Sequence, residues 1–285
     1  NPQINISIST NGSIWNDKTK KLFENLNTHF DVSIDSLDPK TYNKNRKNGD
    51  FKTVFQNTEQ IMELSHLKNN ISLSAKFLIM PLNVKSIPEL FNFYNDRDVV
   101  LNPKFVYHPV LASMEILPKI EIQKSIQLLN QAKPKIKTNT LTQQKNFKKY
   151  NDIITQLERW TNQSKYTLLT TYSKMSIDKL IKEFKKHMEQ FCNQQNKKTS
   201  RQKIMTSCND SIEYLMQSVP RPHSFKKGII GFLLLPPGLI INEMQKGPSE
   251  TLRSRFLQNA DLHIDKFSID NPSLTYKNGS NNGNQ

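Results

Sequence analysis

A strand pattern followed by a helix pattern recurs along the first part of this chain. Residues 4–9 alternate isoleucine with polar residues, and residues 30–35 alternate Phe, Val and Ile with Asp and Ser. Further strands are predicted from Ser72 to Met80 and from Lys104 to Tyr107. The strand starts are spaced close to the ~30 residues of a βαβ unit. The sequence therefore predicts an α/β fold with about four parallel strands.

Polar residues stand where three of these strands end. The three segments are Thr10-Asn11-Gly12, Ser33-Ile34-Asp35 and Pro81-Leu82-Asn83. Because the carboxyl ends of parallel strands meet at one end of a barrel or sheet, we expect these residues to gather there. The pattern predicts a ligand site at that end.

The chain divides into three regions by its pattern. Residues 1–117 carry the strand-and-helix repeat, and residues 118–219 carry helical stripes, including a helix predicted to begin at an N-cap at Ser176. Residues 220–285 mix Pro, Gly and a short apolar run. We expect this last region to be irregular or partly disordered, and its final residues, NGSNNGNQ, have the composition of a disordered tail.

The chain is basic, with 40 Lys plus Arg, 25 Asp plus Glu and a formal net charge of +15. This charge is compatible with nucleic acid or another polyanion as a partner. The basic residues are scattered and mostly Lys, however, and no aromatic residues alternate with them as a stacking platform for bases requires. No motif supports nucleic-acid binding.

Two cysteines, Cys192 and Cys208, are too few for a disulfide framework and match no common metal-binding spacing. A cytoplasmic location is therefore expected. No signal peptide opens the chain, and the apolar run from Gly228 to Ile241 is short and broken by Pro236-Pro237, so no membrane span is expected.

Two residues of the second strand region and one basic residue after it form a candidate binding set. Ser33 and Asp35 are two residues apart, so a continuing strand would point both to the same side. A carboxylate there can accept hydrogen bonds from the two hydroxyls of a ribose. Arg46, just before the helix that Gly49-Asp50 starts, can pair with a carboxylate or phosphate.

These segments resemble the middle and later strands of radical S-adenosylmethionine (SAM) enzymes. The resemblance lies in ISTNG, then FDVSIDSLDPKTYNKNRKNGDFKTVFQN, then FLIMPLNVKSIPEL, and the phrase HPVLASMEILP is similar to the continuation in members with a shortened accessory region. It is strongest over residues 4–115 and fades beyond about residue 190. The SIDS phrase with its following Arg and GDF is the most specific part.

The resemblance implies a partial TIM-type barrel in residues 1–117, with SAM and a 4Fe–4S cluster as cofactors. The cluster, reduced by an electron donor, would split SAM to a 5′-deoxyadenosyl radical that abstracts hydrogen from a substrate, here unknown. Ser33 and Asp35 would contact the ribose, Arg46 would contact the methionyl carboxylate, and Asn11 and Asn83 would line the cavity.

The cysteine motif CxxxCxxC that binds the cluster is absent from the chain, as is the Gly-Gly-Glu motif of that family. The resemblance begins at the family's third strand, and the first residue is Asn1 rather than Met. We therefore expect the chain to be a fragment whose cluster-binding segment precedes Asn1, and we expect the fragment alone to be inactive.

Two other functions remain open from the sequence. One is a catalytically inactive partial barrel that binds RNA or a protein partner. The other is an ordinary α/β enzyme acting on a nucleotide or sugar phosphate, although no glycine-rich phosphate loop supports it.

Overall fold

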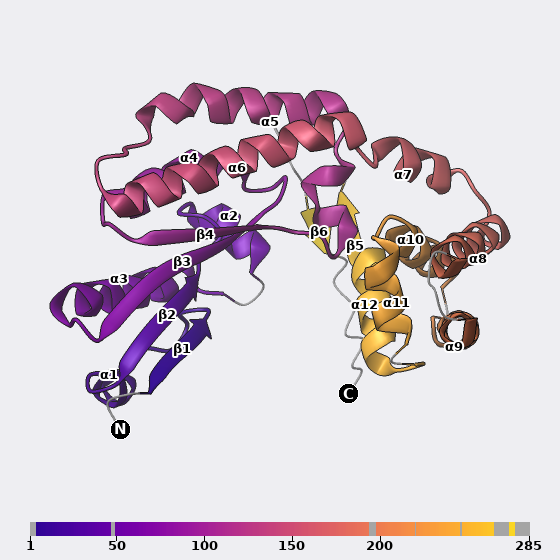
Figure 1. The fold of residues 1–285 in the computed structure, drawn as a ribbon, viewed down its shortest axis with the longest axis horizontal. Helices are drawn as coiled ribbons and strands as arrows, with labels where there is room; N and C mark the ends of the chain where they lie inside the picture. Colours follow the sequence, from indigo (N-terminus) through magenta and orange to yellow (C-terminus); the bar gives the residue numbers. More distant parts are fainter. Residues whose placement is uncertain are drawn as a thin grey trace, which may run out of the picture. The chain divides into compact units, whose positions relative to one another are not determined.

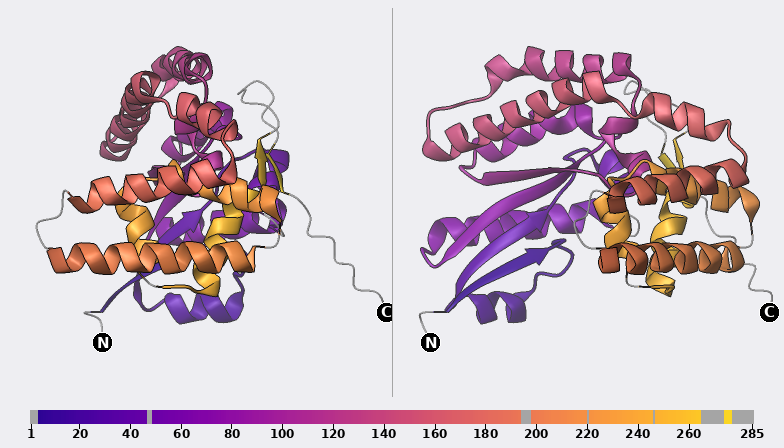
Figure 2. Two further views of the ribbon diagram at one scale, coloured as in Figure 1. Left: turned by 90° about the vertical axis from the view of Figure 1, so that its right-hand side faces the viewer. Right: turned by 45° about the vertical axis from the view of Figure 1, so that its right-hand side comes forward.

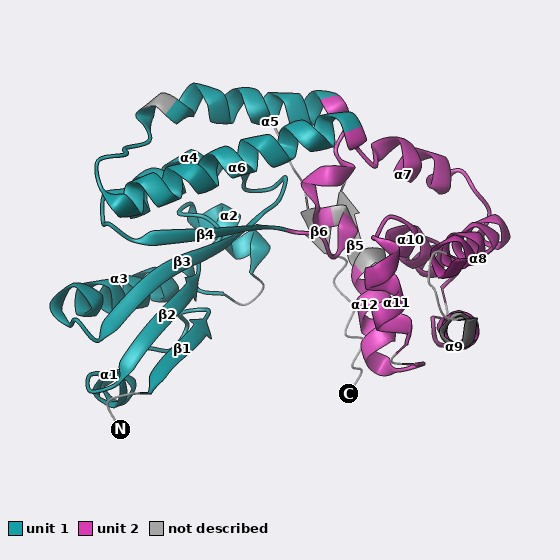
Figure 3. Ribbon diagram, viewed as in Figure 1, with its two compact units in different colours: residues 1–105, 120–162 teal, residues 106–119, 163–285 magenta. Residues whose placement is uncertain are grey.

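The structure is a computed structural model that describes residues 4–46, 49–193, 198–219, 221–245, 247–264 and 274–276. The chain forms two compact units, shown in different colours in Figure 3. Unit 1 comprises residues 1–105 and 120–162, and unit 2 comprises residues 106–119 and 163–285. The units are interleaved along the chain, whereas the predicted organisation divides it after residues 117 and 219.

Unit 1 contains a four-stranded sheet whose strands are all parallel and lie in the order β1-β2-β3-β4 (Figure 1). The strands are β1 (Asn5–Thr10), β2 (Asn27–Ser33), β3 (Ile71–Ile79) and β4 (Val100–Phe105). Consecutive strands are always neighbours, as in the wall of a TIM barrel, and the order never reverses as it does in a doubly wound sheet. The predicted α/β fold with four parallel strands is confirmed.

Strand β4 begins earlier than predicted. Val100, Leu101 and Asn102 pair with β3 although Pro103 follows them directly. Proline lacks an N–H group and is tolerated in edge strands, and β4 is the last strand of this sheet. The prediction of a strand from Lys104 to Tyr107 was therefore wrong at its start, because proline does not end a strand at a sheet edge.

The sheet has one apolar face and one polar face. Phe30, Val32, Ala75, Phe77 and Leu101 are buried, and the pairing of the strands puts them on the same face. Between them stand the polar residues, which alternate along each strand and point to the opposite face. These residues are Ser7 and Ser9 of β1, His29, Asp31 and Ser33 of β2, Ser72, Ser74 and Lys76 of β3, and Asn102 and Lys104 of β4.

Helices connect the strands and complete unit 1. Helix α3 starts where Asp50 caps it by accepting a hydrogen bond from the backbone N–H of Lys52, at 3.1 Å. This confirms the helix predicted to follow Gly49-Asp50. The helices of unit 1 are α1 (Asp17–Phe23), α2 (Pro39–Asn45), α3 (Phe51–Leu67), α4 (Ile87–Asn95), α5 (Lys119–Ala132) and α6 (Leu141–Gln163), with two short 3-10 helices at Val84–Ser86 and Lys133–Lys135.

Unit 2 is mainly helical, and its described elements extend well past Pro220. The long helices α8 and α9 pack against each other in both views of Figure 2. The elements are 3-10 helices at Val110–Ala112 and Met114–Ile116, α7 (Tyr166–Ser173), α8 (Ile177–Asn193), α9 (Lys198–Ser218), α10 (Pro222–Leu233), α11 (Pro237–Met244) and α12 (Glu250–Asp261), and the antiparallel strands β5 (Leu262–Ile264) and β6 (Leu274–Tyr276).

Two predictions for this unit can be compared with the structure. The helix predicted from Ser176 is confirmed, because Ser176 precedes α8 and its hydroxyl accepts a hydrogen bond from the backbone N–H of Lys179. The irregular region predicted after Pro220 instead contains α10, α11 and α12. The predicted disordered tail NGSNNGNQ lies outside the described residues.

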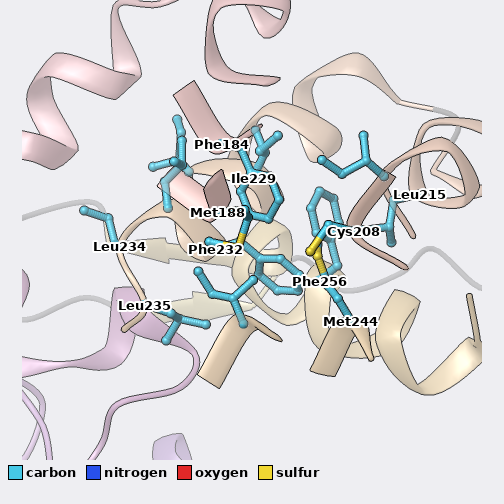
Figure 4. Close-up of a cluster of buried hydrophobic side chains, with 14 of the residues drawn as sticks. Phe184, Met188, Cys208, Leu215, Ile229, Phe232, Leu234, Leu235, Met244 and Phe256 are labelled. Carbon is cyan, nitrogen blue, oxygen red and sulfur yellow. The ribbon is translucent and has the colours of Figure 1, made fainter. Parts of the chain in front are cut away.

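The apolar run from Gly228 to Ile241 belongs to the core of unit 2. Figure 4 shows Phe232, Leu234 and Leu235 of this run together with Phe184 and Met188 of α8 in one buried cluster. Burial in a protein core, rather than in lipid, accounts for its composition. None of the described helices combines the length and the apolar character that a bilayer span requires.

Candidate functional site

A cavity of about 550 Å³ lies beyond the carboxyl end of β1 in unit 1. Its wall comes from the loop after β1, the end of α2 and the start of α3. In parallel α/β folds, ligands bind at this end of the strands. The lining residues are Asn11, Ser13, Tyr42, Arg46, Gly49, Asp50, Thr53 and Val54.

Gly12 shapes this end of β1. Its backbone has φ of +71°, and a Cβ atom there would lie 3.2 Å from a methyl carbon of Val54. A side chain would therefore be strained and crowded against α3. Asn57 of α3 donates a hydrogen bond of 2.8 Å to the carbonyl oxygen of Gly12, which fixes the loop on the helix.

An ion pair joins Arg46, which lines the cavity, to the buried Asp35. The Nε of Arg46 lies 2.9 Å from Oδ2 of Asp35, and the backbone N–H of Leu78 donates to Oδ1 of Asp35, also at 2.9 Å. The Asp35 side chain is only 3% exposed, whereas that of Arg46 is 24% exposed and lines the cavity. Both oxygens of Asp35 thus accept hydrogen bonds from groups of the protein, and Asp35 orients Arg46 toward the cavity.

Asn83 connects the segment just after β2 to the end of β3 through hydrogen bonds. Its amide donates to the carbonyl oxygens of Asp35, at 2.8 Å, and Leu78, at 2.6 Å, while its Oδ1 accepts from the backbone N–H of Met80. The residue is buried, and these bonds use both N–H groups of its amide and one lone pair of its oxygen. Asn83 therefore holds the backbone of Asp35 and Leu78 in place and does not line the cavity.

The remaining predicted residues separate in space. Asn11 is exposed and lines the cavity, where its Oδ1 accepts from both the backbone N–H and the hydroxyl of Ser13. Ser33 instead lies at the end of β2 on the polar face of the sheet, beside Lys76 of β3. Of the five predicted residues, Asn11 and Arg46 line one cavity, Asp35 and Asn83 support it, and Ser33 lies on the polar sheet face.

Besides Asn11 and Arg46, the cavity is lined by six residues that the sequence pattern does not predict as site residues: Ser13, Tyr42, Gly49, Asp50, Thr53 and Val54. Tyr42 is one helical turn before Arg46, whose guanidinium lies 5.9 Å from the Tyr42 ring centre. Hydrogen bonds from the Thr53 hydroxyl and backbone lower the pKa of the exposed Asp50 carboxyl, so Asp50 carries a negative charge at neutral pH. The i, i+4 spacing of Tyr42 and Arg46 was the available signal for the tyrosine.

The chain's cysteines do not contribute to this site. Cys192 and Cys208 are free thiols buried in the core of unit 2, and burial raises the pKa of Cys208 to about 12. Within the described part of the chain, no group of three His, Cys, Asp or Glu residues could hold a metal ion. These residues do not fit a 4Fe–4S cluster, which takes cysteine thiolates as ligands.

Comparison with known proteins gives one partial match. A stretch of 96 residues is 30% identical to a protein from Methanocaldococcus jannaschii described as a probable GTP 3′,8-cyclase. The match covers 34% of this chain and 31% of that relative, so the chain spans about a third of the relative's length. No family model and no solved structure matches the chain significantly.

Proposed function

We propose that unit 1 is part of a radical SAM barrel and that the cavity beside Arg46 binds the amino-acid part of SAM. The observation that carries the proposal is Arg46 itself, a guanidinium fixed by a buried carboxylate and directed into a cavity at the carboxyl end of parallel strands. The partial match to a cyclase of the radical SAM superfamily supports it at the level of the superfamily.

The lining groups fit a ligand that carries both a carboxylate and an ammonium group. Arg46 can donate to the carboxylate through the guanidinium nitrogens that Asp35 does not use. The ionised Asp50 is an acceptor for the ammonium group. Bound SAM supplies radical hydrogen-abstraction chemistry in enzymes that hold a reduced cluster; the chain's own residues bind and orient it.

Asp35 has a different role in this proposal from the one that the sequence pattern predicts. Because its side chain is only 3% exposed, does not line the cavity and already accepts from Arg46 and Leu78, Asp35 acts as a positioning residue for Arg46. Direct contact between Asp35 and a ribose is not required.

The test is a calorimetric titration with two related ligands. S-adenosylhomocysteine has the amino-acid part, whereas 5′-methylthioadenosine has the same nucleoside without it. We expect Arg46→Gln to weaken S-adenosylhomocysteine binding about tenfold or more, the equivalent of one charge-assisted hydrogen bond. Binding of 5′-methylthioadenosine should stay unchanged.

Arg159→Gln is the matched control, because Arg159 is an exposed arginine of α6 in the same unit and does not line the cavity. It should bind both ligands like the wild type. No binding of S-adenosylhomocysteine by the wild type, or an equal loss for both ligands in Arg46→Gln, would contradict the proposal. Circular dichroism of each variant separates a lost contact from a lost fold.

A further inference from the structure

Basic side chains gather on the polar face of the unit 1 sheet, away from the lining of the Arg46 cavity. Lys76 belongs to β3, Lys104 to β4, and Lys149 to α6, which runs beside β4 (Figure 1). The pairing of Leu78 with Lys104 and of Lys76 with Asn102 puts Lys76 and Lys104 on the same face.

Hydrogen bonds hold Lys149 against the edge of this face. Its Nζ donates to the carbonyl oxygen of Leu101, at 2.6 Å, and to Oδ1 of Asn102, at 2.8 Å. Both partners are neutral, so these contacts orient the ammonium group without cancelling its charge. Burial lowers the pKa of Lys149, and the nearby charges of Lys104 and Lys145 lower it further. The positive charges of Lys104, Lys145 and Lys149 repel one another, and a bound anion would relieve this repulsion.

Asp31 organises the rest of the network. Its Oδ2 lies 2.9 Å from Nζ of Lys76, its Oδ1 accepts from Asn102 at 3.3 Å, and the hydroxyl of Ser74 also donates to it. The same Asn102 accepts the bond from Lys149. A continuous set of hydrogen bonds therefore crosses β2, β3 and β4 and fixes two ammonium groups.

The charges around this network do not balance. One carboxylate, Asp31, lies among Lys76, Lys104, Lys145 and Lys149, and Lys104 and Lys145 are exposed. Next to them, His29 is 43% exposed and exchanges hydrogen bonds with Ser72 and Ser74. The face thus presents fixed positive charge together with hydroxyl and imidazole groups.

We propose that this polar face binds a small molecule through a phosphate group, with Lys76, Lys104 and Lys149 around the phosphate oxygens. Three lysines with one shared carboxylate leave net positive charge for an oxyanion. The serines and His29 offer hydrogen-bonding groups for the rest of the molecule. The site is separate from the Arg46 cavity, and the inference does not depend on SAM binding there.

The experiment measures binding of inorganic phosphate, pyrophosphate and citrate to the whole chain by calorimetry at constant ionic strength. We expect saturable pyrophosphate binding that Lys104→Met and Lys149→Met each weaken about fivefold or more. Lys21→Met, a matched control on exposed α1, should bind as the wild type does. Lys104 is exposed, so its variant tests the site even if Lys149→Met fails to fold.

Several results would overturn the proposal. One is the absence of saturable binding, and another is an equal loss in Lys21→Met, which would indicate general charge attraction. Equal affinity for citrate would refute the choice of phosphate. Binding of single-stranded RNA that pyrophosphate does not displace would assign the face to a macromolecule instead.

Discussion

Replacing Asp35 tests whether a buried carboxylate controls the position of Arg46. In Asp35→Asn the side-chain oxygen can still accept from the backbone N–H of Leu78, but the charge opposite Arg46 is lost. Hydrogen bonds to charged groups contribute about 1.5–3 kcal/mol, so we expect unit 1 to lose roughly that much unfolding free energy. The partly exposed Arg46 can reach water, which keeps the loss below the ~3–5 kcal/mol of a fully buried pair.

Asp35→Ala separates the two bonds of the carboxylate. It removes both, and the N–H of Leu78 loses its partner, which adds about 1–3 kcal/mol to the loss. The difference between the Ala and Asn variants therefore measures the Leu78 bond. The difference between Asn and wild type measures the pairing with Arg46.

Urea unfolding followed by tryptophan fluorescence is the suitable assay, because both tryptophans, Trp15 and Trp160, lie in unit 1. The cycle of Asp35→Asn, Arg46→Gln and the double variant should give a coupling energy of about 1 kcal/mol or more. A coupling below about 0.5 kcal/mol, the limit of additivity for independent sites, would refute the reasoning. The position of Arg46 would then be set by something other than Asp35.

Two further outcomes are expected. In α10, Gly228→Ala puts a Cβ 2.2 Å from a ring carbon of Phe256, so we expect unit 2 to lose about 1–3 kcal/mol of unfolding free energy. Phe256→Leu in the same chain should restore part of this stability. An unchanged melting temperature in Gly228→Ala would contradict the packing. Burial raises the pKa of Asp31, but hydrogen bonds from Ser74, Lys76 and Asn102 outweigh burial, and the net pKa is lowered. The ionised Asp31 therefore stabilises the fold above the unfolded-state pKa of about 3.9, and this stabilisation is lost as the pH falls through the lowered pKa. The difference in melting temperature between wild type and Asp31→Asn should therefore shrink from about pH 6 to about pH 3, and a constant difference would contradict this.

The strands and their polar ends could be predicted because they depend on local alternation. Residues 4–9 and 30–35 alternate with a period of two, and the structure has parallel strands over Asn5–Thr10 and Asn27–Ser33, which include most of these residues. The end of the first strand at Gly12 and the helix after Asp50 could also be predicted, since they depend on the conformational and capping preferences of single residues.

The role of Asp35 could not be predicted by the same reasoning. Alternation relates Asp31 to Ser33 within β2, but β2 ends at Ser33, and beyond its end the period of two no longer determines the direction of a side chain. The bond that fixes Asp35 comes from Leu78, which is 43 residues away in the sequence. Only the pairing of β2 with β3 brings the two together.

The helices after Pro220 were missed for a related reason. Pro236-Pro237 interrupts the apolar run, and proline within such a run favours an irregular chain. In the structure Pro237 is at the first position of α11, where its missing N–H costs no hydrogen bond. The prolines separate two buried helices.

One arrangement occurs twice in unit 1 and links its two candidate sites. Asp31 and Asp35, four residues apart at the end of β2, each hold a basic side chain from another element, Lys76 in one case and Arg46 in the other. A carboxylate that pairs with a basic side chain fixes that side chain and offsets its positive charge. An anionic ligand is therefore bound strongly only where additional basic groups are present. On the polar face, Lys149 and Lys104 supply that charge, whereas at the cavity the guanidinium has unused donors and Asp50 adds a negative charge. The polar face therefore favours a phosphate, and the cavity favours a ligand with charges of both signs.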